Sequence, residues 1–353
     1  MTPPALPSAT LDRRPSAAGR DLLVTPSPAL TQPSGPALLA DQLAAALREG
    51  GDSLSLLRSA VPHDRRDRFL SLLRIYDLHT APLEVVGDAA RHQHAPAVAE
   101  LKNRLEAPWL AELDAAWDEA GALNRCRTAG EVVQAMRAVA ARDRLPEAYG
   151  WLAKTATWEQ VVEFLALEGG PDGGFDDLVA VCQVGLSGSA KLELGKNYWD
   201  EMGQGDLAGV HTQLHHDLVR AIDLPVVPRE QMSEAALERA ALGGLLATNR
   251  WLQPEMIGAL GLLELQAGPR CRMVLKAFDR LGAPAGAYPF YVEHAEVDPV
   301  HGKDWMDKAI EPLAEERPEW GPRMVKGAWW RSQINLGFFA DLRARLVDEH
   351  PAA

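Results

Sequence analysis

Residues Tyr291 to Trp305 read YVEHAEVDPVHGKDW, and three polar side chains in this stretch decide how the rest of the chain is interpreted. His294, Asp298 and His301 follow a His-x3-Asp-x2-His pattern. Residues three and four apart share a face of a helix, so these side chains can point into one small volume. Two imidazoles and a carboxylate suit a first-row transition metal, most suggestively non-haem iron. The alternative is a polar helix end with two unrelated histidines, and the triplet alone does not decide between them.

Length, charge and cysteine content narrow the class of protein. The 353 residues are enough for one large domain or two modest ones. The 36 basic and 49 acidic residues give a net charge of −13, which argues against nucleic-acid or anionic-membrane partners. Three separated cysteines form no Cys-based metal motif and fit a reducing compartment. Because no apolar run approaches the ~18 residues of a membrane span and no signal core is present, we expect a cytoplasmic protein.

The chain divides into three regions by composition. Residues 1–36 are rich in Pro, Ala, Ser and Thr, which predicts a disordered leader. Residues 37–150 carry apolar side chains at helical spacing and are interpreted as an accessory helical region without an indicated function. Residues 151–353 continue in helices with almost no alternating β pattern. The prediction is an all-α protein with about seven helices in this last region.

Glycine and proline set several helix ends in residues 151–353. We expect SGSAKLELGKNYWDEM and DLAGVHTQLHHDLVRAI to form helices on either side of a break at Gly203 and Gly205. PEMIGALGLLELQ and GPRCRMVLKAFDRLG are expected to form two further helices.

A dinuclear carboxylate site needs about four carboxylates and two or more histidines from different helices of a bundle. Buried carboxylates are costly without a partner, so acids inside apolar helix faces are candidate ligands. Glu264 lies in the otherwise uncharged run IGALGLLELQAG, and Glu168 closes the apolar run VVEFLALE. Glu201 and His211 are ten residues apart across the Gly203–Gly205 break, and a loosened turn there would let both reach one cluster.

Each of these candidates has a rival. Glu193 lies eight residues before Glu201 on nearly the same face, and Glu163 lies five before Glu168. His215 follows His211 by four and could be a ligand or a hydrogen-bonding partner. The doublet Asp176–Asp177 is interpreted as charge at a helix N-terminus.

The order Glu, Glu-x9-His, Glu, His-x3-Asp-x2-His resembles the haem-oxygenase-like diiron oxidases, also described as iron-containing redox enzymes. The run ELGKNYWDEMGQGDLAGVH is similar to the stretch around the second ligand helix of that family. The intervals fit as well, with 53 residues from His211 to Glu264 and 30 from Glu264 to His294. The resemblance covers about residues 150–345 and implies a haem-oxygenase-like bundle of about seven core helices.

The resemblance implies two Fe2+ ions and seven metal ligands, with O2 as co-substrate. One iron would be held by Glu168, His211 and Glu264, and the other by Glu201, His294, Asp298 and His301. Glu264 would bridge the two. No catalytic residue beyond these ligands is indicated, and whether Glu168, Glu163 or Glu193 is the first ligand stays open.

Pro299 lies between Asp298 and His301, and Gly302 follows. A proline inside a helix costs ~3 kcal/mol and removes a backbone hydrogen bond. We therefore expect residues 290–305 to be weakly helical without metal and the second iron to be labile, as the resemblance also implies.

The expected activity is an O2-dependent oxidation of a small amino-acid-like or amine metabolite, by N-oxygenation, oxidative C–C cleavage or desaturation. The sequence is compatible with an external electron donor and with a homodimer through the front helices. Three rivals remain: a metal-free helical scaffold or regulatory protein, a haem-oxygenase-type haem-binding protein, and a zinc hydrolase. A haem-binding protein of this kind needs a proximal histidine on the first core helix, and residues 150–168 contain no histidine. Zinc sites rarely use this many carboxylates.

Overall fold

The computed structural model describes residues 38–169 and 174–348. In these residues the chain forms helices and no strand, with one isolated bridge between Met202 and Val210, so the all-α prediction is confirmed. Among the described helices, none is both long and apolar enough to cross a bilayer. The predicted leader, residues 1–36, lies outside the described residues.

The front region contains seven α-helices in its described part: α1 (Leu39–Glu49), α2 (Asp52–Ser55), α3 (Arg65–Thr80), α4 (Leu83–Val86), α5 (Pro96–Asp118), α6 (Ala129–Arg142) and α7 (Glu147–Lys154). The later helices are α8 (Trp158–Glu168), α9 (Phe175–Cys182), α10 (Gly188–Glu201), α11 (His211–Ala221), α12 (Glu234–Thr248), α13 (Gln253–Leu281), α14 (Tyr288–Asp304), α15 (Glu311–Glu316) and α16 (Trp320–Arg343). A π-helical turn, Trp305–Ile310, connects α14 to α15.

The described residues belong to one compact unit in which the front helices pack on the later ones. Helix α3 contacts α12, and α6 contacts both α13 and α16. The division between an accessory region and a metal-binding domain near residue 150 therefore stays a prediction.

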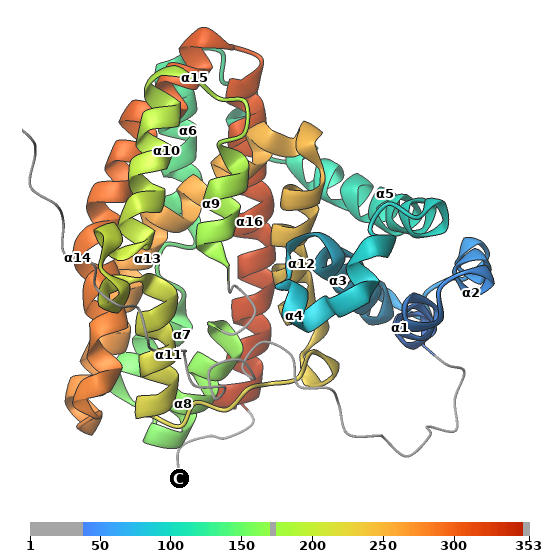
Figure 1. Cartoon of the computed structure of the whole chain (residues 1–353). Coiled ribbons are helices and arrows are strands. Elements are labelled where there is room, and N and C mark those ends of the chain that lie inside the picture. Colours follow the sequence, from blue (N-terminus) through green and yellow to red (C-terminus); the bar gives the residue numbers. More distant parts are fainter. Residues whose placement is uncertain (1–37, 170–173, 349–353) are drawn as a thin grey trace, which may run out of the picture. The chain divides into compact units, whose positions relative to one another are not determined.

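Helix α13 is the central element for the site. It packs along α14 on one side and α16 on the other, and Figure 1 shows it between these two helices. Two glycines permit these close contacts. A Cβ on Gly302 of α14 would lie 2.9 Å from the backbone oxygen of Glu264, and a Cβ on Gly258 would lie 1.8 Å from the backbone oxygen of Met324 in α16. The ligand-bearing faces of α13 and α14 are therefore held close together.

The sequence predicted two helices between Pro254 and Gly282, and this prediction is wrong. Gln253–Leu281 is one α-helix with Pro269 inside it. Proline removes one backbone donor and crowds the preceding turn, so it commonly ends a helix. Here the neighbouring Gly268 packs against the ring of Pro299 in α14, 3.0 Å from a Cβ built on the glycine. The close packing along α14 maintains the helix across the proline.

Candidate metal centre

Three of the predicted ligands meet between α13 and α14. Glu264, Asp298 and His301 each offer one ligand atom, and these atoms lie within 4.8 Å of one another. All three residues are buried, with Glu264 4% and Asp298 3% exposed. Glu264 Oε2 lies 3.7 Å from His301 Nδ1. The His-x3-Asp-x2-His spacing thus places Asp298 and His301 on the face of α14 that meets Glu264.

The predicted break between Glu201 and His211 is present. Helix α10 ends at Glu201, and Gly203 and Gln204 take positive φ values of 59° and 53°. A Cβ on Gly203 would lie 2.5–2.9 Å from the backbone of Gly209 and Val210, so only glycine fits this tight reversal. The reversal places the first residue of α11, His211, beside the last residue of α10.

Glu201, His211 and His294 form a second group next to the first. Glu201 Oε2 lies 2.7 Å from His211 Nδ1, and the rings of His211 and His294 are 4.5 Å apart. The Glu201–His211 contact lacks the alignment of a hydrogen bond. Atoms that bind one metal at ~2.1 Å lie about 3 Å apart when their bonds are perpendicular, so this short contact fits two ligands of one ion.

Two hydrogen bonds fix which ring nitrogen faces the centre. His294 Nδ1 lies 2.6 Å from the carbonyl oxygen of Phe290, so this nitrogen donates and Nε2 keeps its lone pair. His301 Nε2 donates to Asp200 Oδ2 at 3.0 Å, which leaves the lone pair on Nδ1, the atom that faces Glu264. A carboxylate behind a histidine is a common support for metal ligands. The role of Asp200 was not predicted from the sequence, because nothing in the spacing shows which helix α10 faces.

Several buried polar atoms in this cluster lack a hydrogen-bond partner. Within residues 38–169 and 174–348, none is present for His301 Nδ1, Asp298 Oδ2, His211 Nδ1 or Asn197 Oδ1. Buried polar atoms are almost always paired because desolvation without a partner costs about 1–3 kcal/mol each. Three of these atoms belong to predicted ligands. The residues therefore fit a bound metal cation, which would satisfy them together.

The protonation behaviour reflects the same crowding. Burial, helped by the charge of Glu201, raises the pKa of Glu264 to about 8. Burial and the charges of Glu264 and Glu201 raise the pKa of Asp298 well above its usual range. Burial lowers the pKa of His294 to about 4, with the neighbouring His211 acting in the same direction. A cation bound among these groups would stabilise the charged form of the carboxylates and the neutral form of the imidazoles.

Glu168 is placed differently from the other six predicted ligands. Its carboxylate accepts a hydrogen bond from Tyr149 at 3.1 Å and lies 3.4 Å from the Arg239 guanidinium. Its rival Glu163 lies in an exposed ion pair with Arg345, 2.8 Å away. Neither carboxylate lies in the group formed by Glu264, Asp298 and His301.

Two other acids, Glu193 and Asp176, interact with the centre through their charges. Glu193 is 5% exposed, 3.6 Å from Lys308, and its charge acts on Glu264. Asp176 is half-buried near the start of α9, whereas Asp177 is exposed. Burial and the charge of Asp177 raise the pKa of Asp176, and the charge of Glu201 acts in the same direction. Both residues lie in the first turn of α9, so the interpretation of the doublet as charge at a helix N-terminus is confirmed.

Residues 162–335 match the model of a family described as iron-containing redox enzymes. This region contains all seven predicted ligands and helices α9 to α15 complete. No curated protein matches the chain. The family is iron-containing and redox-active, which agrees with the carboxylate and imidazole cluster. Over residues 162–335 the chain therefore belongs to the iron-containing redox enzyme family, with a haem-oxygenase-like helical fold.

Proposed function

We propose that the chain is a non-haem diiron oxidase or oxygenase that uses O2 to oxidise a small amino-acid-like or amine metabolite. The reaction class is N-oxygenation, oxidative C–C cleavage or desaturation. The observation that carries the proposal is the buried cluster of carboxylates and imidazoles in which His301 Nδ1 and Asp298 Oδ2 lack a hydrogen-bond partner within the described chain. A metal-free scaffold would leave these atoms unsatisfied, so the cluster counts against that alternative.

Six residues would hold the irons: Glu201, His211, Glu264, His294, Asp298 and His301. Contacts group Glu264 with Asp298 and His301, and Glu201 with His211 and His294. The division inferred from the family resemblance groups them otherwise, and it stays a prediction. Asp176 and Glu168 are the two candidates for a seventh ligand. We favour Asp176, because Glu168 is engaged by Arg239 and Tyr149 while the charge of Glu201 acts on Asp176.

Bound iron would supply O2 activation and one-electron redox chemistry. The chain's own residues orient the ligands for it. Asn197 Nδ2 donates to Glu264 Oε1 at 2.8 Å, which turns Oε2 toward His301. Asp200 accepts a hydrogen bond from Nε2 of His301, and the Phe290 carbonyl accepts one from Nδ1 of His294. Burial of the cluster limits the access of water to reactive oxygen species.

The test is iron stoichiometry after anaerobic Fe(II) loading, followed by optical spectra on mixing with O2. We expect about two irons per chain and a transient visible absorption band in the wild type. His294→Ala should lose both. His94→Ala, which changes an exposed histidine of the front region, is the matched control and should keep both. Haem binding would instead appear as a Soret band after haem addition, and no stoichiometric iron would favour the scaffold.

A further inference from the structure

A continuous row of aromatic rings leads away from the metal centre. The ring of His294 lies 4.3 Å from that of Phe290, and Phe290 lies 5.2 Å from Tyr291. Tyr291 lies 5.5 Å from Phe278, and Phe278 lies 6.2 Å from Trp158. Edge-to-face and tilted pairs of this kind are also ordinary core packing. This row differs from a packing cluster in what lies at its two ends.

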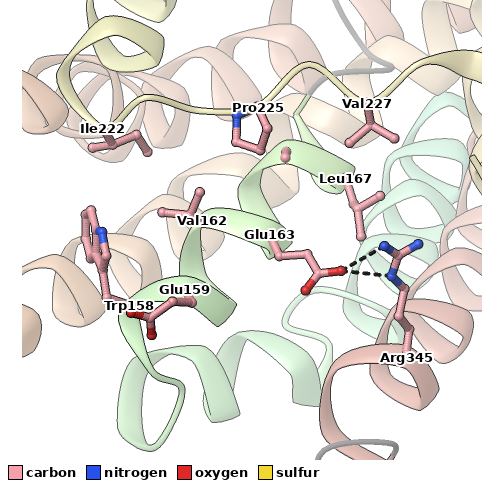
Figure 2. A pocket seen from close by; sticks show the side chains of 10 residues that line it. Trp158, Glu159, Val162, Glu163, Leu167, Ile222, Pro225, Val227 and Arg345 are labelled. Atoms are coloured by element: carbon pink, nitrogen blue, oxygen red, sulfur yellow. Dashed lines mark hydrogen bonds and ion pairs between the residues drawn. The ribbon is translucent and has the colours of Figure 1, made fainter. Parts of the chain in front are cut away.

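One end is a candidate metal ligand, and the other is a partly exposed tryptophan at the surface. Trp158 lines a groove of ≈ 510 Å³ between α8 and residues 222–227. Figure 2 shows Trp158 at one end of this groove and the Glu163–Arg345 ion pair at the other. The intervening walls carry apolar side chains, among them Val162, Ile222 and Val227. The groove is large enough for a small-molecule reductant to reach the indole.

We propose that Tyr291 and Trp158 form an electron path from this groove to the metal centre, which discharges oxidising equivalents formed there when no substrate is bound. The inference rests on the proposed function. Tyrosine and tryptophan are the aromatic side chains that can be oxidised by one electron, whereas Phe278 serves as a bridge. Electron tunnelling weakens exponentially with distance, so rings in contact provide a faster path than separated ones.

Trp158 gives one electron to the metal centre by way of Phe278 and Tyr291, and it releases its indole proton to water in the groove. Tyr291 gives an electron to the centre and regains one from Trp158, so it is unchanged at the end. A thiol restores Trp158 with one electron and one proton. Two thiols oxidised in this way pair as a disulfide.

Without a thiol, the Trp158 radical adds O2 and becomes a stable oxidation product. This trapping provides a readout that is independent of turnover. The iron-loaded protein is exposed to O2 without substrate, and oxidation at each tryptophan is measured by peptide mass spectrometry. Trp199 and Trp251 are 52% and 58% exposed, so attack from solution would favour these two residues. The electron path predicts that Trp158 is oxidised more than either.

Tyr291→Phe should lower oxidation of Trp158 severalfold, and added glutathione should do the same in the wild type. Tyr288→Phe is the matched control, because the Tyr288 ring also contacts Phe278, at 5.6 Å, but does not lie between Phe278 and His294. This variant should leave Trp158 oxidation unchanged. A tyrosyl radical signal in samples frozen soon after O2 addition should disappear in Tyr291→Phe alone.

Two results would overturn the inference, and they differ from failure of the proposed function. Iron-loaded protein whose oxidation follows exposure, with Trp199 and Trp251 ahead of Trp158, would exclude the path. So would Trp158 oxidation that is equal in wild type and Tyr291→Phe. A chain that binds no iron would instead refute the diiron oxidase, and the electron path with it.

Discussion

Two faces of helix α13 carry buried polar groups, and they are satisfied very differently. On one face, Gln266 and Arg270 meet Asp143, which also accepts hydrogen bonds from Ser332 at 2.9 Å and Asn335 at 3.3 Å. Gln266 donates to Asp143 at 2.8 Å, and Arg270 lies 3.4 Å from its other oxygen. On the other face, Glu264 meets Asp298 and His301, where Asp298 Oδ2 and His301 Nδ1 lack a hydrogen-bond partner within the described chain.

The comparison shows how to separate a structural polar network from a metal site in the same core. A buried acid surrounded by donors is complete, because each oxygen has its hydrogen bonds and the charge has its arginine. A buried acid surrounded by other acids and by lone pairs is not complete. Its environment raises the cost of the negative charge until a cation binds.

The largest effect is expected on the satisfied face. Asp143→Ala removes the acceptor of Gln266, Ser332 and Asn335 and leaves Arg270 buried without its carboxylate. Breaking a buried charge pair in this way costs ~3–5 kcal/mol. Urea unfolding of the metal-free protein should show a loss of this size. A change of less than about 1 kcal/mol, within the range of exposed pairs, would contradict the structural reading of this face.

The pH dependence of the metal-free protein should come from the other face. The pKa of Glu264 is about 8 when folded, against 4.5 for the free side chain, so the folded state holds an additional proton between these values. Stability therefore falls as pH rises through this window, by on the order of 5 kcal/mol at most, since one pKa unit corresponds to ~1.4 kcal/mol. Unfolding of metal-free Glu264→Gln between pH 5 and 8 should show a flatter profile than wild type. Equal slopes would contradict the assignment.

The choice between Asp176 and Glu168 is tested by iron content. If Asp176 is a ligand, Asp176→Asn should bind about one iron fewer than wild type, while Glu168→Gln keeps its stoichiometry and loses only the interactions with Tyr149 and Arg239. Asp177→Asn is the matched control, since it alters the exposed member of the doublet. If Glu168→Gln alone lost iron, the result would support Glu168 as the seventh ligand, as the family resemblance implies.

Asp200 should act through His301. Removal of a carboxylate that supports a metal-bound histidine typically weakens metal affinity 10–100-fold. We expect this for Asp200→Ala, whereas Asp200→Asn retains an oxygen that can accept the Nε2 proton and should recover most of the affinity. Asp118→Ala, which changes an exposed acid at the end of α5, is the control. The Nε2 proton of His301, followed by NMR in zinc-loaded protein, should exchange faster in Asp200→Ala, and unchanged exchange would rule out this positioning role.

The smallest effect concerns the ligand helix itself. Helix α14 is continuous from Tyr288 to Asp304 despite Pro299. The missing backbone hydrogen bond should still make the segment open more often without metal. Hydrogen exchange at residues 290–305 should be slower in iron-loaded than in metal-free protein, with α13 much less affected. Comparable protection of residues 290–305 in both forms would contradict the proposed coupling between metal binding and folding of this segment.

Spacing within one helix was the most informative signal in the sequence. The triplet on α14 and the isolated Glu264 on α13 could be placed because helical periodicity determines which residues share a face. The Gly203–Gly205 break could be placed because only glycine fits its backbone. These local rules do not say which helix lies opposite. The approach of Asp200 to His301, the partial burial of Asp176 and the network around Asp143 all depend on tertiary packing, as does the persistence of α13 through Pro269.

The most direct test of the central claim combines stability and metal binding in Glu264→Gln. Without metal, the neutral amide removes a buried charge, so at pH 8 the variant should unfold at a higher temperature than wild type. On Fe(II) addition under anaerobic conditions, the wild type should gain thermal stability and the variant should gain little. A variant that is less stable than wild type without metal, yet equally stabilised by Fe(II), would show that Glu264 is a structural acid like Asp143 and not part of a metal site.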